Sequence, residues 1–419
     1  MTAYRRKPVA VVGAGIIGVM LARKLQKDGK RVLLFDPVEP GMETSFGNAG
    51  YIAMDEIFPL AHGHVLASLP RMLRDPLGPL SIRWQEMHRL WPWFLKFTLA
   101  CRPKVAARGV AALASIQGGA EAAWKAVIAQ EKLSDLIHQR GALKIFESDR
   151  GFEESQGQRE AQRNFGIDCR EMSAKEVRQM IPELVKTIRH GVFYPNGMHT
   201  TNPYAVTKRL FDAFLKDGGK FFKERVLFLE HKATHIKRVR TNAALYAVGK
   251  VVVTAGYQSG RILTPLNYRV PIIAERGYHI EVTHKPLSFD MPIGVYERGF
   301  YITPMDSGLR LAGTTEFSSA AHNENPNWRR SIILKRHIKE LMPGITGKET
   351  SRWMGHRPTL PDFLPVLGKA PKLDNLYLAF GHQHLGLTLA AITGDIMVDV
   401  IAGRKPSIDL APFDIKRFQ

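Results

Sequence analysis

Cysteine is scarce in this sequence, and long apolar runs are absent. The 419 residues include two cysteines, Cys101 and Cys169, which are too few for a disulfide framework and lack the CxxC spacing of a structural zinc site. No uninterrupted run reaches the roughly 20 apolar residues that span a bilayer. We therefore expect neither a disulfide scaffold, nor a metal site, nor an integral membrane protein, and a reducing cytoplasmic location fits best.

Acidic residues are scarce relative to basic ones. The sequence has 59 Lys and Arg against 39 Asp and Glu, which gives a net charge of +20. Such a surface attracts anions, so nucleic acid, an anionic membrane and anionic small molecules are open alternatives. No nucleic-acid-binding motif accompanies the charge, so nucleic acid is not expected as a partner.

A glycine-rich turn separates two apolar runs near the start of the sequence. Residues 9–12 and 32–35 are continuously apolar, as expected of buried parallel strands. The second run is followed directly by Asp36, and the segment between the runs has the periodicity of a helix. That helix begins within the turn Gly13, Ala14, Gly15, Ile16, Ile17 and Gly18.

This arrangement is the fingerprint of a dinucleotide-binding βαβ unit. Gly13 permits the tight turn, Gly15 lets phosphate oxygens approach the backbone, and Gly18 lets the helix lie close to the strand. The helix N-terminus attracts the pyrophosphate, and Asp36 can accept hydrogen bonds from ribose hydroxyls. The alternative is a tight turn in another α/β unit, but the complete context favours a dinucleotide site.

The segment from about 65 to 108 differs in composition from the rest. It holds eight Lys and Arg residues, only two acids, and three of the six tryptophans, Trp84, Trp91 and Trp93. Basic residues interleaved with aromatic ones are typical of a peripheral membrane contact. A helical insertion whose aromatic residues belong to the core explains the same pattern, and both alternatives stay open.

The remaining patterns predict two interleaved domains. Residues 251–256 form another buried strand that ends on Gly256, and residues 268–315 alternate as antiparallel strands do. We expect an α/β fold in which a Rossmann-type domain interleaves with an antiparallel-sheet α+β substrate domain. The first comprises residues 1–60, 190–260 and 350–419, and the second 61–189 and 261–349.

Several separated segments together resemble the D-amino acid oxidase and dehydrogenase superfamily, and most closely its bacterial D-amino acid dehydrogenase branch. They are the fingerprint, ETSFGNAG at 43–50, VVVTAG at 251–256, GHRPTLPDFLPVLG at 355–368 and FGHQHLGLTL at 380–389. Their order and spacing match the family over nearly the whole sequence, and residues 60–190 correspond least. The last segment is similar to that of relatives acting on proline-type substrates.

The resemblance implies FAD, bound without a covalent link, because no cysteine lies in the segment where covalent branches carry one. The fingerprint would hold the ADP half, Val226 would contact adenine, and the C-terminal loop would lie at the flavin ring. The further cofactor residues that it implies are Thr44, Ser45, Asn48, Ala49, Gly50, Gly256, Gly381, His382, Gly386, Leu387 and Thr388. Since the sequence has a single dinucleotide fingerprint, the substrate itself is the expected reductant.

The same resemblance names candidates for the substrate site. Arg357 matches the family arginine that binds the substrate carboxylate, and a guanidinium suits that role; a structural ion pair is the alternative. Tyr301 resembles a tyrosine that supports the carboxylate, and a packed core residue is its alternative. Tyr51 and His384 follow as residues near the substrate, and either can equally be structural.

The expected reaction is oxidation of a D-amino acid. Hydride would pass from Cα to flavin N5, and the imino acid would hydrolyse to a 2-oxo acid and ammonia. A quinone is the expected electron acceptor, at the cytoplasmic face of the inner membrane, and D-proline or hydroxy-D-proline is a specific substrate hypothesis. A glycine- or sarcosine-type oxidase that uses oxygen is one alternative. A basic membrane- or nucleic-acid-binding protein with a structural nucleotide is another.

Overall fold

The N-terminal βαβ unit forms as the sequence predicts. The computed structural model describes residues 7–75, 78–319 and 325–419. Strand β1 (Val9–Val12), helix α1 (Ile16–Lys27) and strand β2 (Val32–Phe35) follow one another, and β1 and β2 pair in parallel. Both strands are buried along their whole length, which explains their continuous apolar sequence.

The two strands of this unit belong to a six-stranded sheet. All neighbouring strands are parallel except the last pair. The order is β10 (Lys220–Phe222), β2, β1, β14 (Lys250–Val253), β21 (Leu376–Phe380) and β20 (Val366–Lys369). The predicted strand at 251–253 is therefore the direct neighbour of β1, although about 240 residues separate them.

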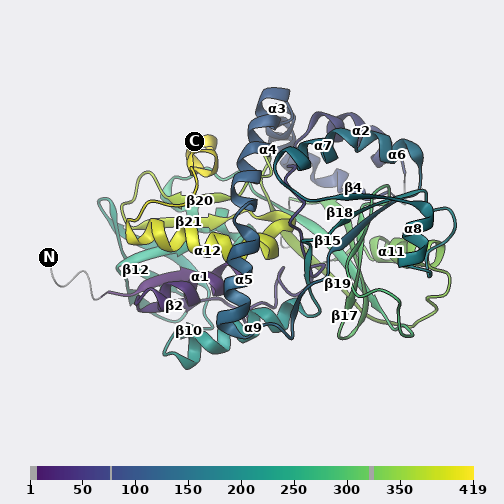
Figure 1. Cartoon of the computed structure of the whole chain (residues 1–419). Helices are drawn as coiled ribbons and strands as arrows, with labels where there is room; N and C mark the ends of the chain where they lie inside the picture. The colour runs from purple at the N-terminus through teal and green to yellow at the C-terminus, as the bar shows by residue number, and fades with distance from the viewer. Residues whose placement is uncertain (1–6, 76–77, 320–324) are drawn as a thin grey trace.

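Each face of this sheet is covered by a different layer (Figure 1). Val9 and Val11 of β1 pack into one hydrophobic cluster, and Ala10 and Val12 pack into another. The first cluster includes residues of α1, α5 (Ala120–Glu131), α9 (Pro203–Lys216) and α12 (Gly386–Ala402). The second includes residues of a three-stranded sheet, β11 (Val226–Lys232), β12 (His235–Thr241) and β13 (Leu245–Ala247).

A nine-stranded, mostly antiparallel sheet forms the other half of the molecule (Figure 1). Its order is β19 (Glu349–Thr359), β15 (Ile273–Val282), β18 (Gly308–Phe317), β17 (Phe300–Met305), β16 (Ile293–Val295), β6 (Ala142–Phe146), β8 (His190–Tyr194) and β7 (Arg170–Ser173), with β4 (Leu80–Ile82) beside β18. The expected combination of a Rossmann-type sheet with an antiparallel one is confirmed.

Shorter elements complete the described chain. Strands β3 (Tyr51–Ile52), β9 (Met198–Thr200) and β5 (Ile137–Gln139) form a small antiparallel sheet. The remaining α-helices are α2 (Gly63–Arg74), α3 (Met87–Ala100), α4 (Pro103–Gln117), α6 (Asp149–Glu154), α7 (Gln156–Asn164), α8 (Ala174–Met180), α10 (Ser259–Leu263) and α11 (Arg329–Leu341).

Strand pairing differs from the predicted domain ranges at two places. Strands β8 and β19 lie in ranges expected of the nucleotide domain, yet both pair within the nine-stranded sheet. Conversely, α5 lies in the predicted substrate domain but packs with α1 and α12. These differences arise because backbone pairing between distant segments leaves no signal in local periodicity.

The basic aromatic segment contains both core and surface tryptophans. Trp93 is 3% exposed and stacks on Phe97, so it belongs to the core. Trp91, on the opposite face of α3, is 63% exposed, and Trp84 is exposed as well. The core alternative therefore holds for Trp93, and the membrane contact stays a prediction for the exposed tryptophans.

One helical segment in the described part of the chain is long and apolar enough to cross a membrane. It spans Gln383–Ala402, which includes α12, and 72% of its most apolar stretch is buried inside the protein. Residues of α12 pack in the same cluster as those of α1 and α5, so its apolar character is explained by its place in the core.

Candidate active site

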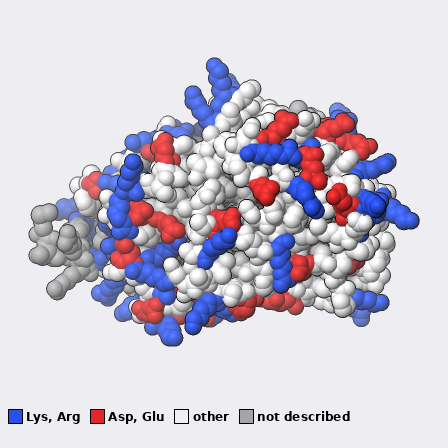
Figure 2. Space-filling model, viewed as in Figure 1, with Lys and Arg blue, Asp and Glu red and all other residues white. Residues whose placement is uncertain are grey.

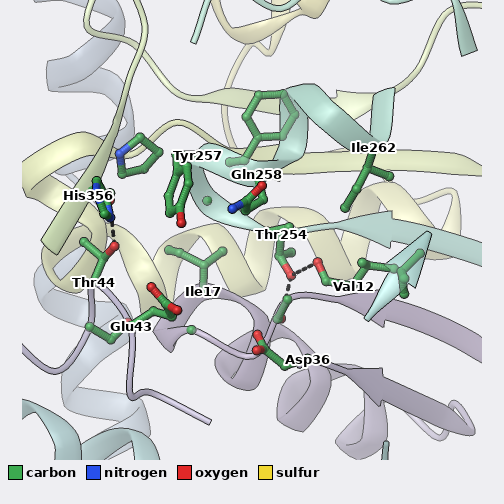
Figure 3. A pocket seen from close by; sticks show the side chains of 18 of the residues that line it. Val12, Ile17, Asp36, Glu43, Thr44, Thr254, Tyr257, Gln258, Ile262 and His356 are labelled. Carbon is green, nitrogen blue, oxygen red and sulfur yellow. Dashed lines mark hydrogen bonds between the residues drawn. The ribbon is translucent and has the colours of Figure 1, made fainter. Parts of the chain in front are cut away.

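A cavity of about 470 Å³ opens at the carboxyl ends of the parallel strands (Figure 3). Val12, Phe35 and Phe380 stand at the ends of β1, β2 and β21, and Thr254 follows β14 directly; all four line it. Ligands of open parallel sheets bind at this edge. The sheet therefore places the fingerprint where a nucleotide site belongs.

Two glycines of the fingerprint are required by close backbone contacts. Gly13 has a φ of +110°, and a Cβ there would lie 2.6 Å from the Thr254 carbonyl oxygen. A Cβ on Gly18 would lie 1.8 Å from the Gly13 carbonyl oxygen. The Thr254 hydroxyl donates to the carbonyls of Val12 and Gly13, at 3.0 and 2.9 Å, and joins β14 to the turn. Only glycine lets helix and strand approach this closely.

The N-terminus of α1 faces the cavity. Gly15 is its N-cap and lines the cavity, as do Ile16 and Ile17. The Ile16 amide donates to the Ser45 hydroxyl at 2.9 Å, which ties the loop at 43–50 to the helix start. The first turn of α1 carries no acidic residue, so its positive dipole end is available to an anion.

Asp36 is held at the end of β2 by backbone amides. Its carboxylate accepts hydrogen bonds from Ala14 N at 2.7 Å and from Val38 N at 3.0 Å. Burial raises the pKa of Asp36 to about 6, against the lowering effect of these two amides. The group is therefore ionised at neutral pH, and each oxygen keeps capacity to accept from a ribose hydroxyl.

Most predicted cofactor residues meet at this cavity. The residues that line it are Gly13, Gly15, Ile16, Ile17, Asp36, Thr44, Ser45, Val226, Gly256, Gly381, His382 and Gly386. Asn48 and Leu387 line a small adjoining cavity of about 40 Å³ that shares Thr44 and Ser45 with the first. Burial lowers the pKa of His382 to about 3, so its imidazole is neutral at pH 7.

The other predicted cofactor residues do not line these cavities. Gly18 packs against the turn, and Ala14 holds Asp36. Gly50 has a φ of +77° and donates its amide to Asn48 Oδ1, which shapes the loop that also contains Ala49. The hydroxyl of Thr388 accepts from the Ala53 amide at 3.0 Å, so it joins α12 to the chain after β3.

Several lining residues are not among the cofactor residues predicted from the sequence. Glu43 and Tyr257 project into the cavity near Thr44 (Figure 3). Arg225 and Arg261 contribute positive charge to the lining, and Gln258 contributes an amide. Arg225 directly precedes the predicted adenine contact Val226, a position that sequence reasoning could have considered for an anionic ligand.

Arg357 lies on β19 and forms an ion pair with its cross-strand neighbour on β15. Its Nη1 donates to Glu275 Oε1 at 2.8 Å and to the Thr315 hydroxyl at 3.0 Å. Among the described residues, its Nε and Nη2 have no hydrogen-bond partner, and its side chain is 23% exposed. Arg357 is therefore in a structural ion pair and still has donors for a ligand.

The two predicted tyrosines contact a pair of acids that sequence reasoning missed. Tyr51 and Tyr301 lie side by side, with ring centroids 5.3 Å apart. The Tyr51 hydroxyl donates to Asp55, and the Tyr301 hydroxyl donates to Glu56 at 3.1 Å. Two adjacent acids in an acid-poor stretch were the available signal, since residues 57–120 contain only two others.

Lys144 on β6 completes this acid cluster, which we define as Asp55, Glu56 and Lys144. Its ammonium lies 3.4 Å from Asp55 and 3.3 Å from Glu56. Burial raises the pKa of Asp55. Burial acts in the same direction on the pKa of Glu56 and is the largest single effect. The Lys144 charge, the electrostatic effect of His384 and the hydrogen bonds from Tyr301 and Lys144 together outweigh it, so the pKa of Glu56 falls below its ordinary value. Glu56 is therefore an anion at neutral pH.

His384 links the tyrosines and acids to Arg357. It lies in the 3₁₀ turn Gln383–Leu385, directly before α12. Burial lowers the pKa of His384, while the charge of Glu56 raises it and that of Arg357 lowers it further. The imidazole is therefore neutral at pH 7, and its turn packs against β19, the strand that carries Arg357. The fold brings together all four residues predicted for the substrate site.

The chain belongs to a family of flavoenzymes. Residues 8–400 match the family model described as DAO, FAD dependent oxidoreductase. The chain is therefore an oxidoreductase, and its cofactor is FAD. The residues present fit that group, because Gly13, Gly15 and Ile16 at the helix N-terminus line one cavity together with Asp36.

The chain is similar in sequence and in structure to several known proteins. The chain is 31% identical to the D-amino-acid oxidase of Bradyrhizobium diazoefficiens over 98% of both chains. It is 27% identical to the D-amino acid dehydrogenase of Paramagnetospirillum magneticum, again over 98% of both. Among solved structures, glycine oxidase from Geobacillus kaustophilus has a TM-score of 0.78 at 19% identity and covers 99% of each chain. L-proline dehydrogenase from P. horikoshii has a TM-score of 0.77 at 17% identity, with 99% of this chain and 98% of that one covered.

Proposed function

We propose that this protein oxidises a D-amino acid to the imino acid, which hydrolyses to a 2-oxo acid and, where the substrate is acyclic, ammonia. The observation that carries the proposal is Arg357, a partly exposed guanidinium on β19, the strand that packs against the turn with His384 in the C-terminal loop. That loop also lines the nucleotide cavity through Gly381 and His382. The names of the relatives at 31% and 27% identity support a D-amino acid as the substrate.

The residues of the site would bind and orient the substrate. FAD, bound non-covalently, supplies the acceptor for the hydride that leaves Cα. Arg357 would hold the carboxylate through its Nε and Nη2 donors, with Glu275 keeping the guanidinium in place. Orientation of this kind can supply up to roughly 7–11 kcal/mol of rate acceleration. The substrate ammonium would lose one proton to water before or with hydride departure, so no strong base is required of the neutral His384.

Anaerobic reduction of the flavin tests the proposal. We expect at least one D-amino acid to bleach the flavin absorbance of the purified holoenzyme, while its L-enantiomer leaves the absorbance unchanged. The measurement is a spectrum after mixing with a panel of D-amino, L-amino and cyclic imino acids. A flavin that no member of the panel reduces, or that only L-amino acids reduce, would contradict the proposed function.

D-Proline and hydroxy-D-proline have a place in that panel because of the loop sequence. The segment Gly381, His382, Gln383, His384, Leu385 and Gly386 is similar to that of relatives acting on proline-type substrates. We propose a cyclic imino acid as the preferred substrate. The panel checks this directly through the ratio of reduction rates for D-proline and D-alanine.

The electron acceptor in this proposal is a quinone. The relatives include both a D-amino-acid oxidase and D-amino acid dehydrogenases, so their names support either acceptor. Turnover should be faster with a quinone or dye than with oxygen. Stoichiometric peroxide formed at a comparable rate without any dye would favour the oxidase alternative.

The exposed face of α3 supports a peripheral membrane contact, where a quinone would be near. Trp91 and Leu95 are exposed there, together with Arg89 and Lys96. Figure 2 shows basic side chains beside uncharged surface at the top of the view, where Figure 1 places α3. Exposed aromatic residues flanked by cations suit an anionic bilayer surface. We place this contact at the cytoplasmic face of the inner membrane.

Neutralising this face should weaken liposome binding. Each Lys or Arg near an anionic surface contributes about 1 kcal/mol, so Arg89→Gln with Lys96→Gln should lower the affinity for anionic vesicles about 10-fold or more. Sedimentation with vesicles of phosphatidylglycerol and phosphatidylcholine measures this. Arg83→Gln is the comparison, because Arg83 lies near Glu86 and Glu316, at 3.4 and 3.7 Å. Equal binding by all variants would contradict the contact.

A further inference from the structure

Of the two carboxylates in the acid cluster, that of Glu56 is partly exposed and that of Asp55 is buried. The Glu56 side chain is 24% exposed, whereas that of Asp55 is 1% exposed. The hydrogen bond from Tyr301 and the contact with Lys144 both use Oε1 of Glu56. Within the described part of the chain, its Oε2 has no hydrogen-bond partner, so this oxygen can accept from a ligand.

The acid cluster has more acidic groups than basic ones. A single ammonium, that of Lys144, lies between two carboxylates. A carboxylate that is partly removed from water is stabilised by a hydrogen-bonded cation. Asp55 is already occupied by Tyr51 and Lys144 and is closed to solvent. The vacant acceptor for a further cation is therefore Oε2 of Glu56.

The Glu56 carboxylate and the Arg357 guanidinium are opposite charges that both act on the pKa of His384. Arg357 donates to Thr315 on β18, and Tyr301, which holds Glu56, stands on the neighbouring strand β17. The turn that carries His384 packs against β19, the strand of Arg357. Arg357 has vacant donors and Glu56 has a vacant acceptor. An α-amino acid carries its ammonium and carboxylate on one carbon, and that pair of charges is complementary to those of Glu56 and Arg357.

We propose that Glu56 binds the α-ammonium group of the substrate, opposite the carboxylate held by Arg357. The inference rests on the proposed oxidation of an amino acid and adds the group that recognises its nitrogen. Tyr301 acts here as a positioning residue, because its hydroxyl holds Oε1 of Glu56 and leaves Oε2 for the ligand. A carboxylic acid without an amine would meet Arg357 alone.

Two ligand pairs separate the amine from the carboxylate. D-Proline and cyclopentanecarboxylate have the same ring size and differ in the nitrogen, as D-alanine and propanoate do in the open-chain series. Dissociation constants come from the perturbation of the flavin spectrum, or from saturation of the anaerobic reduction rate where the ligand reacts. The readout is the preference of the holoenzyme for the amino acid over its amine-free partner.

Glu56→Gln should reduce this preference about 10- to 100-fold, as expected for loss of a hydrogen bond to a charged group. Binding of the amine-free carboxylate should stay equal or tighten, since a negative charge leaves the site. Glu121→Gln makes the same charge change at the Lys125 pair outside the cluster and is the matched control. Asp55→Asn should have a smaller effect than Glu56→Gln.

An unchanged preference in Glu56→Gln would overturn the proposal, and so would an equal or larger effect of Asp55→Asn. If the Gln variant does not retain flavin, Glu56→Asp keeps the charge, and it should show a smaller loss of preference. Equal weakening of both ligands by that variant would also overturn it. Failure of the proposed function looks different, because the wild-type flavin would then not be reduced by any amino acid.

Discussion

Replacing Arg357 with methionine should raise the KM for the amino-acid substrate by about 100-fold or more. Loss of one partner of a desolvated, hydrogen-bonded charge pair costs roughly 2–5 kcal/mol of binding, and 1.4 kcal/mol is tenfold. The guanidinium has two vacant nitrogens for a carboxylate. The measurement is steady-state kinetics with an artificial acceptor.

The flavin should stay bound in this variant, since Arg357 does not line the nucleotide cavity. Its loss leaves the Glu275 carboxylate with the hydroxyls of Thr315 and Thr359 only, at 3.0 and 2.8 Å. We therefore expect lower thermal stability, because a buried carboxylate then lacks its cation. Arg357→Lys restores the charge and separates these effects. An unchanged KM in both variants would remove Arg357 from the substrate site.

Replacing Gly18 with alanine should weaken FAD binding about 10- to 100-fold. The added Cβ would lie 1.8 Å from the Gly13 carbonyl oxygen and 2.7 Å from the Thr254 hydroxyl. The helix must move away from β1, and overpacking of this kind costs about 1–3 kcal/mol. Displacement of α1 also shifts the amides at its N-terminus away from the pyrophosphate position. Titration of the apoprotein with FAD, followed by fluorescence, gives the dissociation constant.

Gly157 in helix α7 provides the control for this substitution. A Cβ at Gly157 would meet no atom within 4 Å, and the residue is exposed. Gly157→Ala should therefore leave FAD affinity unchanged and raise stability by a few tenths of a kcal/mol, up to about 1 kcal/mol. If Gly18→Ala binds FAD as tightly as Gly157→Ala does, close packing of α1 on β1 is not what positions the cofactor.

The nucleotide site could be derived from the residue order because its parts are local. Strand, turn, helix and strand follow one another within residues 9–36, and each has its own periodicity or glycine requirement. The backbone contacts at Gly13 and Gly18 then follow from the steric demands of a βαβ unit. The resemblance extended this prediction to distant segments such as Val226 and Gly381, which line the same cavity.

The surface charge is less informative than the sequence suggested. Lys and Arg residues are spread over the visible face and are interspersed with acids (Figure 2). Many form ion pairs, as Arg298 does with Glu147 and Glu340. The excess of +20 therefore does not form one continuous patch on that face, and the candidate membrane contact depends on the exposed residues of α3.

The substrate side depends on tertiary contacts that no local pattern encodes. Glu275 meets Arg357 because β15 and β19 pair in one particular register, and a shift of one residue would turn the two side chains to opposite faces. Lys144 reaches Asp55 and Glu56 across almost 90 residues of chain. Local sequence specified the turn that receives the nucleotide, whereas the pairing of distant strands decided which charges surround the substrate.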